Sequence, residues 1–566
     1  MTLRKISTVF TALTVVMGCS DQIANERDQA SNSDTQQVAT TEVATRETKI
    51  HAIEEQEMYA SAVLERQSKS KLSKQAVRSA HVSQMDMMLR VEPPTYNQDR
   101  DNYLESVSNN VHQVLNTPLS TFSIDVDTGS YANVRSYLNM GRKPPTDAIR
   151  EEAFINYFDY QYAASQDKNQ PFSVNTEIAP SPWNEHRQLL RIALKGYDVP
   201  QAERKSSNLV FLVDVSGSMN EANKLPLLVQ SLSMLVKELN EKDTVSLVTY
   251  AGHSSVVLEP TKGNEKETIT NALKSLSAGG GTYGESGIIM AYQQARSNFI
   301  KEGVNRVILA TDGDFNVGIA SIDALKEMIA NERDKGVSLT TLGFGRGNYN
   351  DAMMEQLANI GDGNHAYIDT LHEAKKVLLR QMSGTLQTIA SDVKIQIEFN
   401  PNIVKEYRLI GYQNRILKDE DFNNDKVDAG EIGAGHTVTA LYEITLTGEK
   451  GQIDDLRYDR KTIAAENFEG ELAQVKVRYK LPESEKSVLT TSIVSNHQIK
   501  ERFDHASEDF QFASSVAAFA QKLKDNDYLD SLSYEKIADI ARENRGKDPY
   551  NYRGEFISLV ELAQSL

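Results

Sequence analysis

Between residues 208 and 386, short apolar runs alternate with stretches whose apolar residues recur at helical spacing. "NLVFLVDV" is the first apolar run, "VNRVILATDGD" is a later one, and "KLPLLVQSLSMLVKEL" is typical of the stretches between them. Apolar strands joined by helices form parallel sheets that are covered on both faces. We therefore expect a doubly wound, mainly parallel α/β sheet, which would bind ligands beyond the carboxyl ends of its strands.

Three segments of this region carry oxygen-bearing side chains where strands or helices end. Asp214, Ser216 and Ser218 close the first strand, Thr282 follows three glycines, and Asp312 follows the strand "VILAT". Because loops at one edge of a parallel sheet converge, we expect these five side chains to surround one point. Two carboxylates and three hydroxyls suit a hard divalent cation, Mg²⁺ above all, with Mn²⁺ or Ca²⁺ as alternatives. The set holds no histidine or thiol, which argues against zinc.

The order and spacing of these residues resemble the metal-ion-dependent adhesion site (MIDAS) of von Willebrand factor type A (VWA) domains. In that family D-x-S-x-S is followed by a threonine and then by the aspartate of T-D-G. The resemblance implies that Ser216, Ser218 and Thr282 bind the metal directly or nearly so, and that Asp214 and Asp312 hold it mainly through water. It also implies an open coordination position for a carboxylate of a partner protein. Alone, each segment also fits a helix cap or a turn, and their joint order favours the metal site.

The segments on either side of residues 206–386 show other patterns. Residues 91–200 are expected to form an α+β domain, in which "DAIREEAFINYFDYQY" predicts an aromatic-rich helix. Residues 390–566 begin with period-two strands such as "TVTALYEITL" and end in helices, one of them capped by Ser507. This arrangement resembles bacterial VWA lipoproteins, in which a von Willebrand factor N-terminal-type domain and a C-terminal domain of unknown function flank the VWA domain.

The first residues are similar to a bacterial lipoprotein signal, with a short basic region, an apolar stretch and then Cys19. We expect residues 1–18 to be a signal peptide and Cys19, the only cysteine of the chain, to be lipidated. By resemblance to Gram-negative sorting signals, Ser20 favours the outer membrane. The alternative is an ordinary secretory signal with a chance cysteine. Residues 19–90 are rich in Ser, Thr, Gln and Glu, which predicts a disordered or partly helical tether.

Two other motifs invite functional interpretations that we judge weaker. Asp127-Thr128-Gly129 matches the aspartic protease tripeptide, but such an enzyme needs two of these carboxylates at one site. We predict a strand-to-helix turn there, with Thr128 or Asp127 as the cap. A second motif alternates oxygen ligands like the start of an EF-hand loop, and its residues are Asp421, Asn423, Asp425 and Asp428. The glycine and glutamate of that loop are missing, so an acidic turn is favoured over a weak calcium site.

Composition narrows the functional classes. The net charge is -18 and no run of Lys or Arg is present, which argues against nucleic-acid binding. No zinc-protease motif, serine nucleophile elbow or P-loop occurs, so no catalytic activity is predicted. We therefore predict a membrane-anchored, non-enzymatic binding protein of the bacterial cell envelope that engages an acidic side chain of a partner through Mg²⁺. The alternatives are an envelope scaffold or assembly factor, and a hydrolase with its site in a flanking domain.

Overall fold

The computed structural model describes residues 100–165, 170–200, 203–313, 322–381, 387–454, 468–482, 484–529 and 532–566. All of them belong to one compact unit, Asn97–Leu566. The predicted signal peptide, Cys19 and the tether lie outside the described residues and stay predictions. Within these ranges, no helix is both long enough and apolar enough to span a bilayer.

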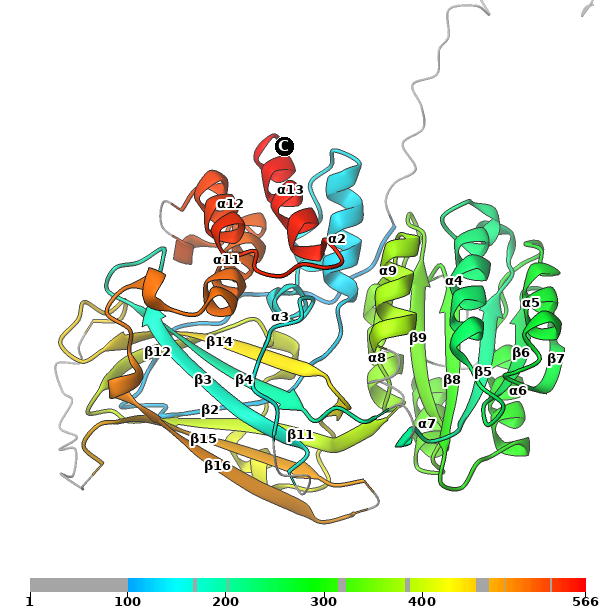
Figure 1. Ribbon diagram of the computed structural model, residues 1–566, viewed down its shortest axis with the longest axis horizontal. Coiled ribbons are helices and arrows are strands. Elements are labelled where there is room, and N and C mark those ends of the chain that lie inside the picture. Colours follow the sequence, from blue (N-terminus) through cyan, green and yellow to red (C-terminus); the bar gives the residue numbers. More distant parts are fainter. Residues whose placement is uncertain are drawn as a thin grey trace, which may run out of the picture. The chain divides into compact units, whose positions relative to one another are not determined.

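The region that is predicted to contain a mainly parallel sheet does contain one (Figure 1). Its central strand β5 pairs in parallel with β6 on one side and with β8 on the other, so the strand order reverses at β5. Among the strands that the structure describes in this sheet, only the edge strand β7 runs antiparallel; it contains Pro260 and was not predicted from sequence. In spatial order the described strands are β10 (His365–Ile368), β9 (Ser338–Phe344), β8 (Val304–Thr311), β5 (Ser207–Asp214), β6 (Thr244–Tyr250) and β7 (Ser254–Lys262).

Helices cover both faces of this sheet, which explains why its inner strands β5, β6, β8 and β9 are buried along almost their whole length. Phe211 and Val213 of β5 pack toward one face, and Val210 and Leu212 pack toward the other. The first face is covered by α4 (Leu225–Glu238), α5 (Lys266–Lys274) and α9 (Leu371–Lys375). The second face is covered by α6 (Gly284–Ser297), α7 (Ile322–Arg333) and α8 (Asp351–Ile360).

The two flanking segments share their sheets, so they form one body rather than two separate domains. In one sheet the N-terminal strands β3 and β4 continue into the C-terminal strands β14 and β12, and in the other β2 pairs with β11. The first sheet contains β1 (His112–Gln113), β12 (Val404–Ile410), β14 (Thr437–Leu446), β4 (Gln188–Gly196) and β3 (Phe172–Pro180). The second contains β13 (Gly430–Gly433), β11 (Thr388–Phe399), β15 (Glu471–Lys480), β16 (Ser487–Ser495) and β2 (Leu119–Ser123). Side chains from both sheets, among them Phe122, Ile192 and Ile395, make a common core.

A layer of helices covers the outer face of the sheet that contains β4 and β14, where Ala193 and Leu441 join its core. The layer consists of α2 (Gly129–Asn139), α3 (Glu151–Ile155), α11 (Glu508–Leu523), α12 (Tyr534–Glu543) and α13 (Tyr552–Gln564). The predicted cap of α11 is confirmed, because Ser507 Oγ accepts a hydrogen bond from the Phe510 N–H at 3.2 Å. The predicted aromatic-rich helix is much shorter than expected and reduces to α3. The aromatic residues after it leave helical geometry and pack on neighbouring helices, as Phe158 does on Phe512 at 5.1 Å between ring centroids.

A buried carboxyl group in α3 predicts a pH-dependent stability. Glu152 is 1% exposed, and its Oε2 accepts a hydrogen bond from the Tyr412 N–H at 2.8 Å. Burial, followed by the charges of Asp125 and Glu151, raises the pKa of Glu152 to about 7. The folded state therefore keeps a proton that the unfolded state loses at the ordinary glutamate pKa. This proton contributes its full stabilisation at pH values below the pKa of Glu152 in the unfolded state. The stabilisation is lost as pH rises through the pKa of Glu152 in the folded state.

We expect Glu152→Gln to become more stable relative to the wild type as pH rises, by on the order of 2 kcal/mol between about pH 5 and about pH 8. A neutral amide can accept the same hydrogen bond without carrying a buried charge. Urea unfolding of both proteins across this range measures the difference. The exposed Glu508 provides the matched control Glu508→Gln, and parallel pH profiles for wild type and Glu152→Gln would contradict the prediction.

Candidate metal centre

The carboxyl end of β5 gathers the oxygens of the D-x-S-x-S segment. Asp214 is the last residue of β5, and its side chain is fully buried. Its Oδ1 accepts a hydrogen bond from the Ser216 N–H at 2.8 Å, which turns the chain as it leaves the strand. After this turn Ser216 Oγ and Ser218 Oγ lie 3.1 Å apart. The alternating polar residues therefore bring two hydroxyls together just after a buried carboxylate.

The glycine-rich loop that carries Thr282 lies against this turn. The Gly217 N–H donates to the Gly280 carbonyl at 3.1 Å, and the Gly279 N–H donates to the Val215 carbonyl at 2.7 Å. Gly280 has a φ of +88°, a conformation that residues with a Cβ rarely adopt, so glycine is needed for this close approach. Thr282 follows two residues later and is half-buried. The loop thus brings a third hydroxyl-bearing residue to the same edge of the sheet.

Asp312 reaches this edge from β8, the parallel neighbour of β5. The Thr311 hydroxyl donates to Asp214 Oδ2 at 2.8 Å and so ties the two strand ends together. Asp312 is fully buried, and its Oδ2 accepts a hydrogen bond from Lys224 Nζ at 3.0 Å. Lys224 is not among the site residues predicted from sequence. A signal was present, because Lys224 lies four residues before Leu228, on the buried face of α4.

The electrostatics of this edge favour a cation. Burial, with a smaller contribution from the charge of Asp312, raises the pKa of Asp214 to about 6, although the hydrogen bonds from Ser216 and Thr311 lower it. A divalent ion beside the two carboxylates would favour their ionised forms. All of the predicted metal-ligand atoms are hard oxygens of carboxylates and hydroxyls. The predicted ligand residues therefore fit Mg²⁺ and do not resemble a zinc site.

The predicted weak calcium loop has a different environment. Asp425 Oδ1 accepts a hydrogen bond from Arg478 Nε at 3.3 Å, and Asn423 Oδ1 accepts one from Arg478 Nη1 at 3.4 Å. Asp428 instead pairs with Arg333 at 3.1 Å, while Asp421 lies in the 3₁₀ turn Asp419–Asn423. Arginines on two sides thus neutralise separate parts of this loop, which favours the acidic-turn interpretation.

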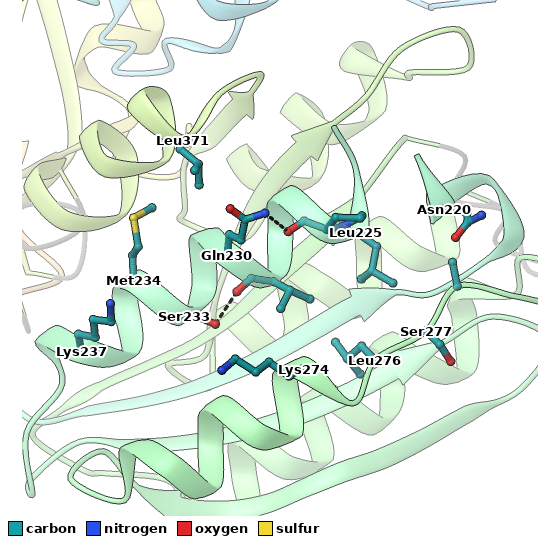
Figure 2. A pocket seen from close by; sticks show the side chains of 13 residues that line it. Asn220, Leu225, Gln230, Ser233, Met234, Lys237, Lys274, Leu276, Ser277 and Leu371 are labelled. Carbon is teal, nitrogen blue, oxygen red and sulfur yellow. Dashed lines mark hydrogen bonds between the residues drawn. The ribbon is translucent and has the colours of Figure 1, made fainter. Parts of the chain in front are cut away.

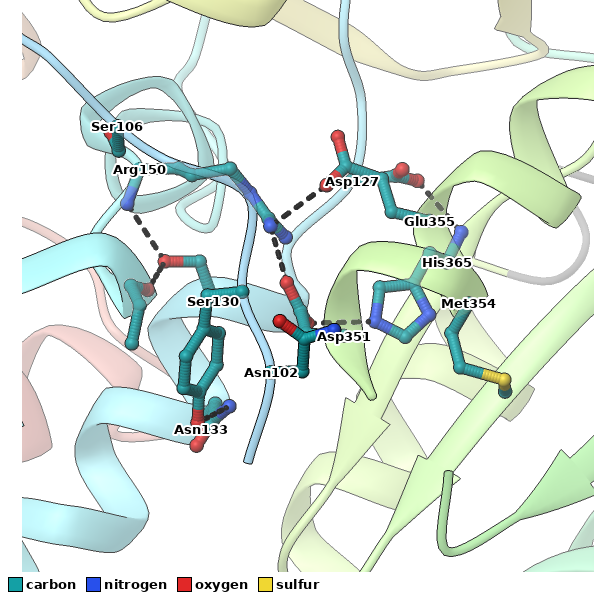
Figure 3. Close-up of polar contacts among 12 residues, drawn as sticks. Asn102, Ser106, Asp127, Ser130, Asn133, Arg150, Asp351, Met354, Glu355 and His365 are labelled. Atoms are coloured by element: carbon teal, nitrogen blue, oxygen red, sulfur yellow. Dashed lines mark hydrogen bonds and ion pairs between the residues drawn. The ribbon is translucent and has the colours of Figure 1, made fainter. Parts of the chain in front are cut away.

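The D-T-G tripeptide forms the predicted strand-to-helix turn, but the predicted side-chain cap is wrong. Thr128 is the N-cap residue of α2 and makes no capping hydrogen bond through its side chain. Asp127 Oδ1 instead accepts a hydrogen bond from the His365 N–H at 2.8 Å (Figure 3). Next to this contact Arg150 pairs with Asp351 at 2.5 Å. This segment therefore fastens the flanking body to α8 and β10.

A groove of about 760 Å³ lies between α4 and α5 (Figure 2). One end begins at Asn220 and Ser277, close in sequence to Ser218 and to the glycine-rich loop, and the other end carries Lys237 and Lys274. Within the described ranges, neither of these lysines has a carboxylate partner. The floor between the two ends is largely apolar and includes Leu225, Val229, Met234 and Leu276.

Comparison with known proteins places the whole described region in one family. Residues 208–381 match the family model of the von Willebrand factor type A domain, residues 97–191 match the model described as von Willebrand factor, and residues 384–566 match the model described as "Uncharacterized protein YfbK, C-terminal". YfbK of Escherichia coli K12 is 48% identical over 472 residues, which covers 82% of this chain and 81% of YfbK. The chain belongs to the YfbK family of VWA-domain proteins.

Other similarities of this YfbK-family protein are more distant. Human inter-alpha-trypsin inhibitor heavy chain H3 is 26% identical over 261 residues, which covers 42% of this chain and 28% of the human protein. The solved structure of a von Willebrand factor type A protein from Catenulispora acidiphila is 14% identical, with a TM-score of 0.37. The match covers 70% of this chain and 91% of the Catenulispora chain. VWA domains mediate protein–protein interactions and commonly bind a divalent metal.

Proposed function

We propose that this protein binds a partner protein through Mg²⁺ held at the MIDAS of its VWA domain. The observation that carries the proposal is the hydroxyl pair of Ser216 and Ser218, 3.1 Å apart beside the buried Asp214. Asp312 and the loop of Thr282 come to the same edge from other elements of the fold. The proposed ligand set is Asp214, Ser216, Ser218, Thr282 and Asp312.

The residues divide into two roles. The hydroxyls of Ser216, Ser218 and Thr282 are the direct ligands, and the two aspartates orient bound water and balance charge. Mg²⁺ would supply a concentrated positive charge with one coordination position open to a carboxylate, and Mn²⁺ or Ca²⁺ can replace it. Because the direct ligands are neutral, much of that charge remains available to an Asp or Glu side chain of the partner. The proposal contains no catalytic step.

The groove between α4 and α5 extends this binding surface. Its apolar floor starts next to the metal loops and ends at Lys237 and Lys274. A partner segment that fits it carries one carboxylate for the metal, apolar side chains for the floor, and a second acidic group for the two lysines. We therefore assign the groove to an acidic, amphipathic segment of the same partner protein.

The N-terminal sequence supports partner binding at the bacterial cell envelope. We propose that lipid on Cys19 anchors the protein in the bacterial cell envelope, in the outer membrane as Ser20 favours, and that residues 19–90 tether the VWA domain to the anchor. Partner binding would then occur close to a membrane surface. The support for this part is the lipoprotein-like signal described above.

The test is capture of the partner by the full-length protein from an extract of the cells that produce it. We expect one bound protein to be retained in Mg²⁺ and lost both in EDTA and with Asp214→Asn. We expect Val229→Asp, which places a charge on the groove floor, to lose the same partner while Mg²⁺ uptake is unchanged. Retention of the partner by Asp214→Asn in EDTA would refute the proposed function, and retention by Val229→Asp would refute the groove.

A further inference from the structure

A buried lysine ammonium lies beside one of the proposed metal-site carboxylates. Lys224 is 3% exposed, and its Nζ lies 3.0 Å from Asp312 Oδ2. Among the described residues, Lys224 has a second carboxylate within 4 Å, that of Glu221 at 3.9 Å, whose side chain is 67% exposed to solvent. Removing an ammonium from water is unfavourable unless it is paired, so the contact with Asp312 accounts for the position of this charge.

The fold is shaped to admit the lysine stem. The Lys224 carbonyl accepts a hydrogen bond from the Leu228 N–H at 2.9 Å, which fixes the backbone at the start of α4. On the opposite side the stem crosses Gly345, where an added Cβ would come within 2.2 Å of Lys224 Cε. Gly345 has a φ of +72°, so a side chain there is disfavoured by backbone conformation as well. Lys224 therefore occupies a defined position and is not a mobile surface lysine.

The lysine changes the charge of the metal site. The carboxylates of Asp214 and Asp312 and the ammonium of Lys224 sum to -1, whereas the two carboxylates alone would sum to -2. With a divalent cation the site carries +1 when Lys224 is present and is neutral without it. The metal attracts a carboxylate in either case, and a site with +1 attracts it more strongly than a neutral site does.

We propose that Lys224 is the residue that makes the metal-loaded site select an anionic ligand, and that it does so while weakening the affinity for the metal itself. The inference rests on the proposed function, because it concerns the same metal site. Lys224 acts through charge at a fixed position, as a specificity-determining residue. A carboxylate has two oxygens and several lone pairs, so the contact of Lys224 with Oδ2 leaves Asp312 able to take part in a metal site.

The test compares Mg²⁺ binding of the wild type and Lys224→Met by calorimetry on the full-length protein. Methionine keeps the unbranched stem against Gly345 and removes the charge. We expect Lys224→Met to bind Mg²⁺ at least about tenfold more tightly, which corresponds to about 1.4 kcal/mol. The matched control is Lys301→Met, the same change at an exposed position just before β8, at the end of that strand opposite Asp312, which should leave the affinity unchanged.

A second measurement follows the ligand side of the site. With Mn²⁺ as the bound ion, water-proton relaxation reports displacement of metal-bound water by acetate, with acetamide as the neutral control probe. We expect the carboxylate probe to bind the wild type in preference to the amide probe, and Lys224→Met to lose most of that preference. A purely structural lysine would lower stability in the variant without moving either quantity in these directions.

The outcomes separate this inference from the function on which it rests. Equal or weaker Mg²⁺ binding by Lys224→Met, with normal binding by the wild type, overturns the role of Lys224 and leaves the proposed function in place. Absence of Mg²⁺ binding by both proteins overturns both. If Lys224→Met and Lys224→Gln fail to fold in metal-free buffer, recovery of the fold on addition of Mg²⁺ supports the inference, and failure to recover refutes it.

Discussion

Asp214→Asn is expected to weaken Mg²⁺ binding by about 10–100-fold, the range typical for loss of a group that orients metal-bound water. The substitution removes one of the two carboxylate charges and changes little else. An asparagine oxygen can still accept the hydrogen bond from the Ser216 N–H, and the Thr311 hydroxyl can rotate to accept from the new amide. The fold should therefore persist while metal affinity falls.

Calorimetric titration of the full-length protein with Mg²⁺, together with a thermal unfolding curve, checks both parts of this expectation. The matched control is Asp323→Asn, which makes the same chemical change at an exposed position in the first turn of α7. It should bind Mg²⁺ as the wild type does. Unchanged affinity in Asp214→Asn would place the cation elsewhere and would remove the basis of the proposed function.

The candidate site could be proposed from sequence because topology makes it predictable. The carboxyl ends of neighbouring parallel strands meet at one edge, so a motif after β5 and an aspartate after β8 must approach each other once the sheet is recognised. Lys224 could not be assigned in this way. Its helical spacing marks a buried position, but only the three-dimensional structure shows that Asp312 is the carboxylate that pairs with it.

In the flanking body, the sequence predicts the strands but not which strands pair with each other. The period-two runs correctly predict the strands β11, β14, β15 and β16, because alternation is a local property of a half-buried strand. Alternation does not identify the neighbouring strand. The pairing of Phe122 with Ile395 joins β2 to β11 across the entire VWA domain, and nothing near either residue reports it. Shared sheets between the two ends of the region could therefore be found only in the structure.

A buried arginine at the junction of the VWA domain and the flanking body leads to the largest predicted change in stability. Arg135 of α2 is 1% exposed. Its Nη2 lies 2.5 Å from Asp369 Oδ1 and 2.8 Å from Glu373 Oε2, and its Nη1 lies 3.0 Å from Glu555 Oε2. The Tyr157 hydroxyl completes the environment with a hydrogen bond of 2.6 Å to Glu373. One guanidinium thus compensates carboxylates from the end of the VWA domain and from α13.

Arg135→Met is expected to lower the free energy of unfolding by about 3–5 kcal/mol, because it leaves buried carboxylates without their main counter-ion. Thermal unfolding and limited proteolysis of the full-length protein measure the loss. Arg204→Met, the same change at an exposed position just before β5, should alter stability by no more than about 0.5 kcal/mol.

A double-mutant cycle with Glu373→Gln tests whether uncompensated charge causes this loss. Glu373 is 1% exposed, and Arg135 is the largest influence that lowers its pKa. Without the arginine this carboxylate is the costliest charge left behind, so Arg135→Met combined with Glu373→Gln should be more stable than Arg135→Met alone. If the two losses simply add, a charge left on Glu373 is not the cause, and the loss comes from the contacts of the Arg135 guanidinium with the rings of Tyr131 and Tyr157, whose centroids lie 5.7 Å from its Cζ.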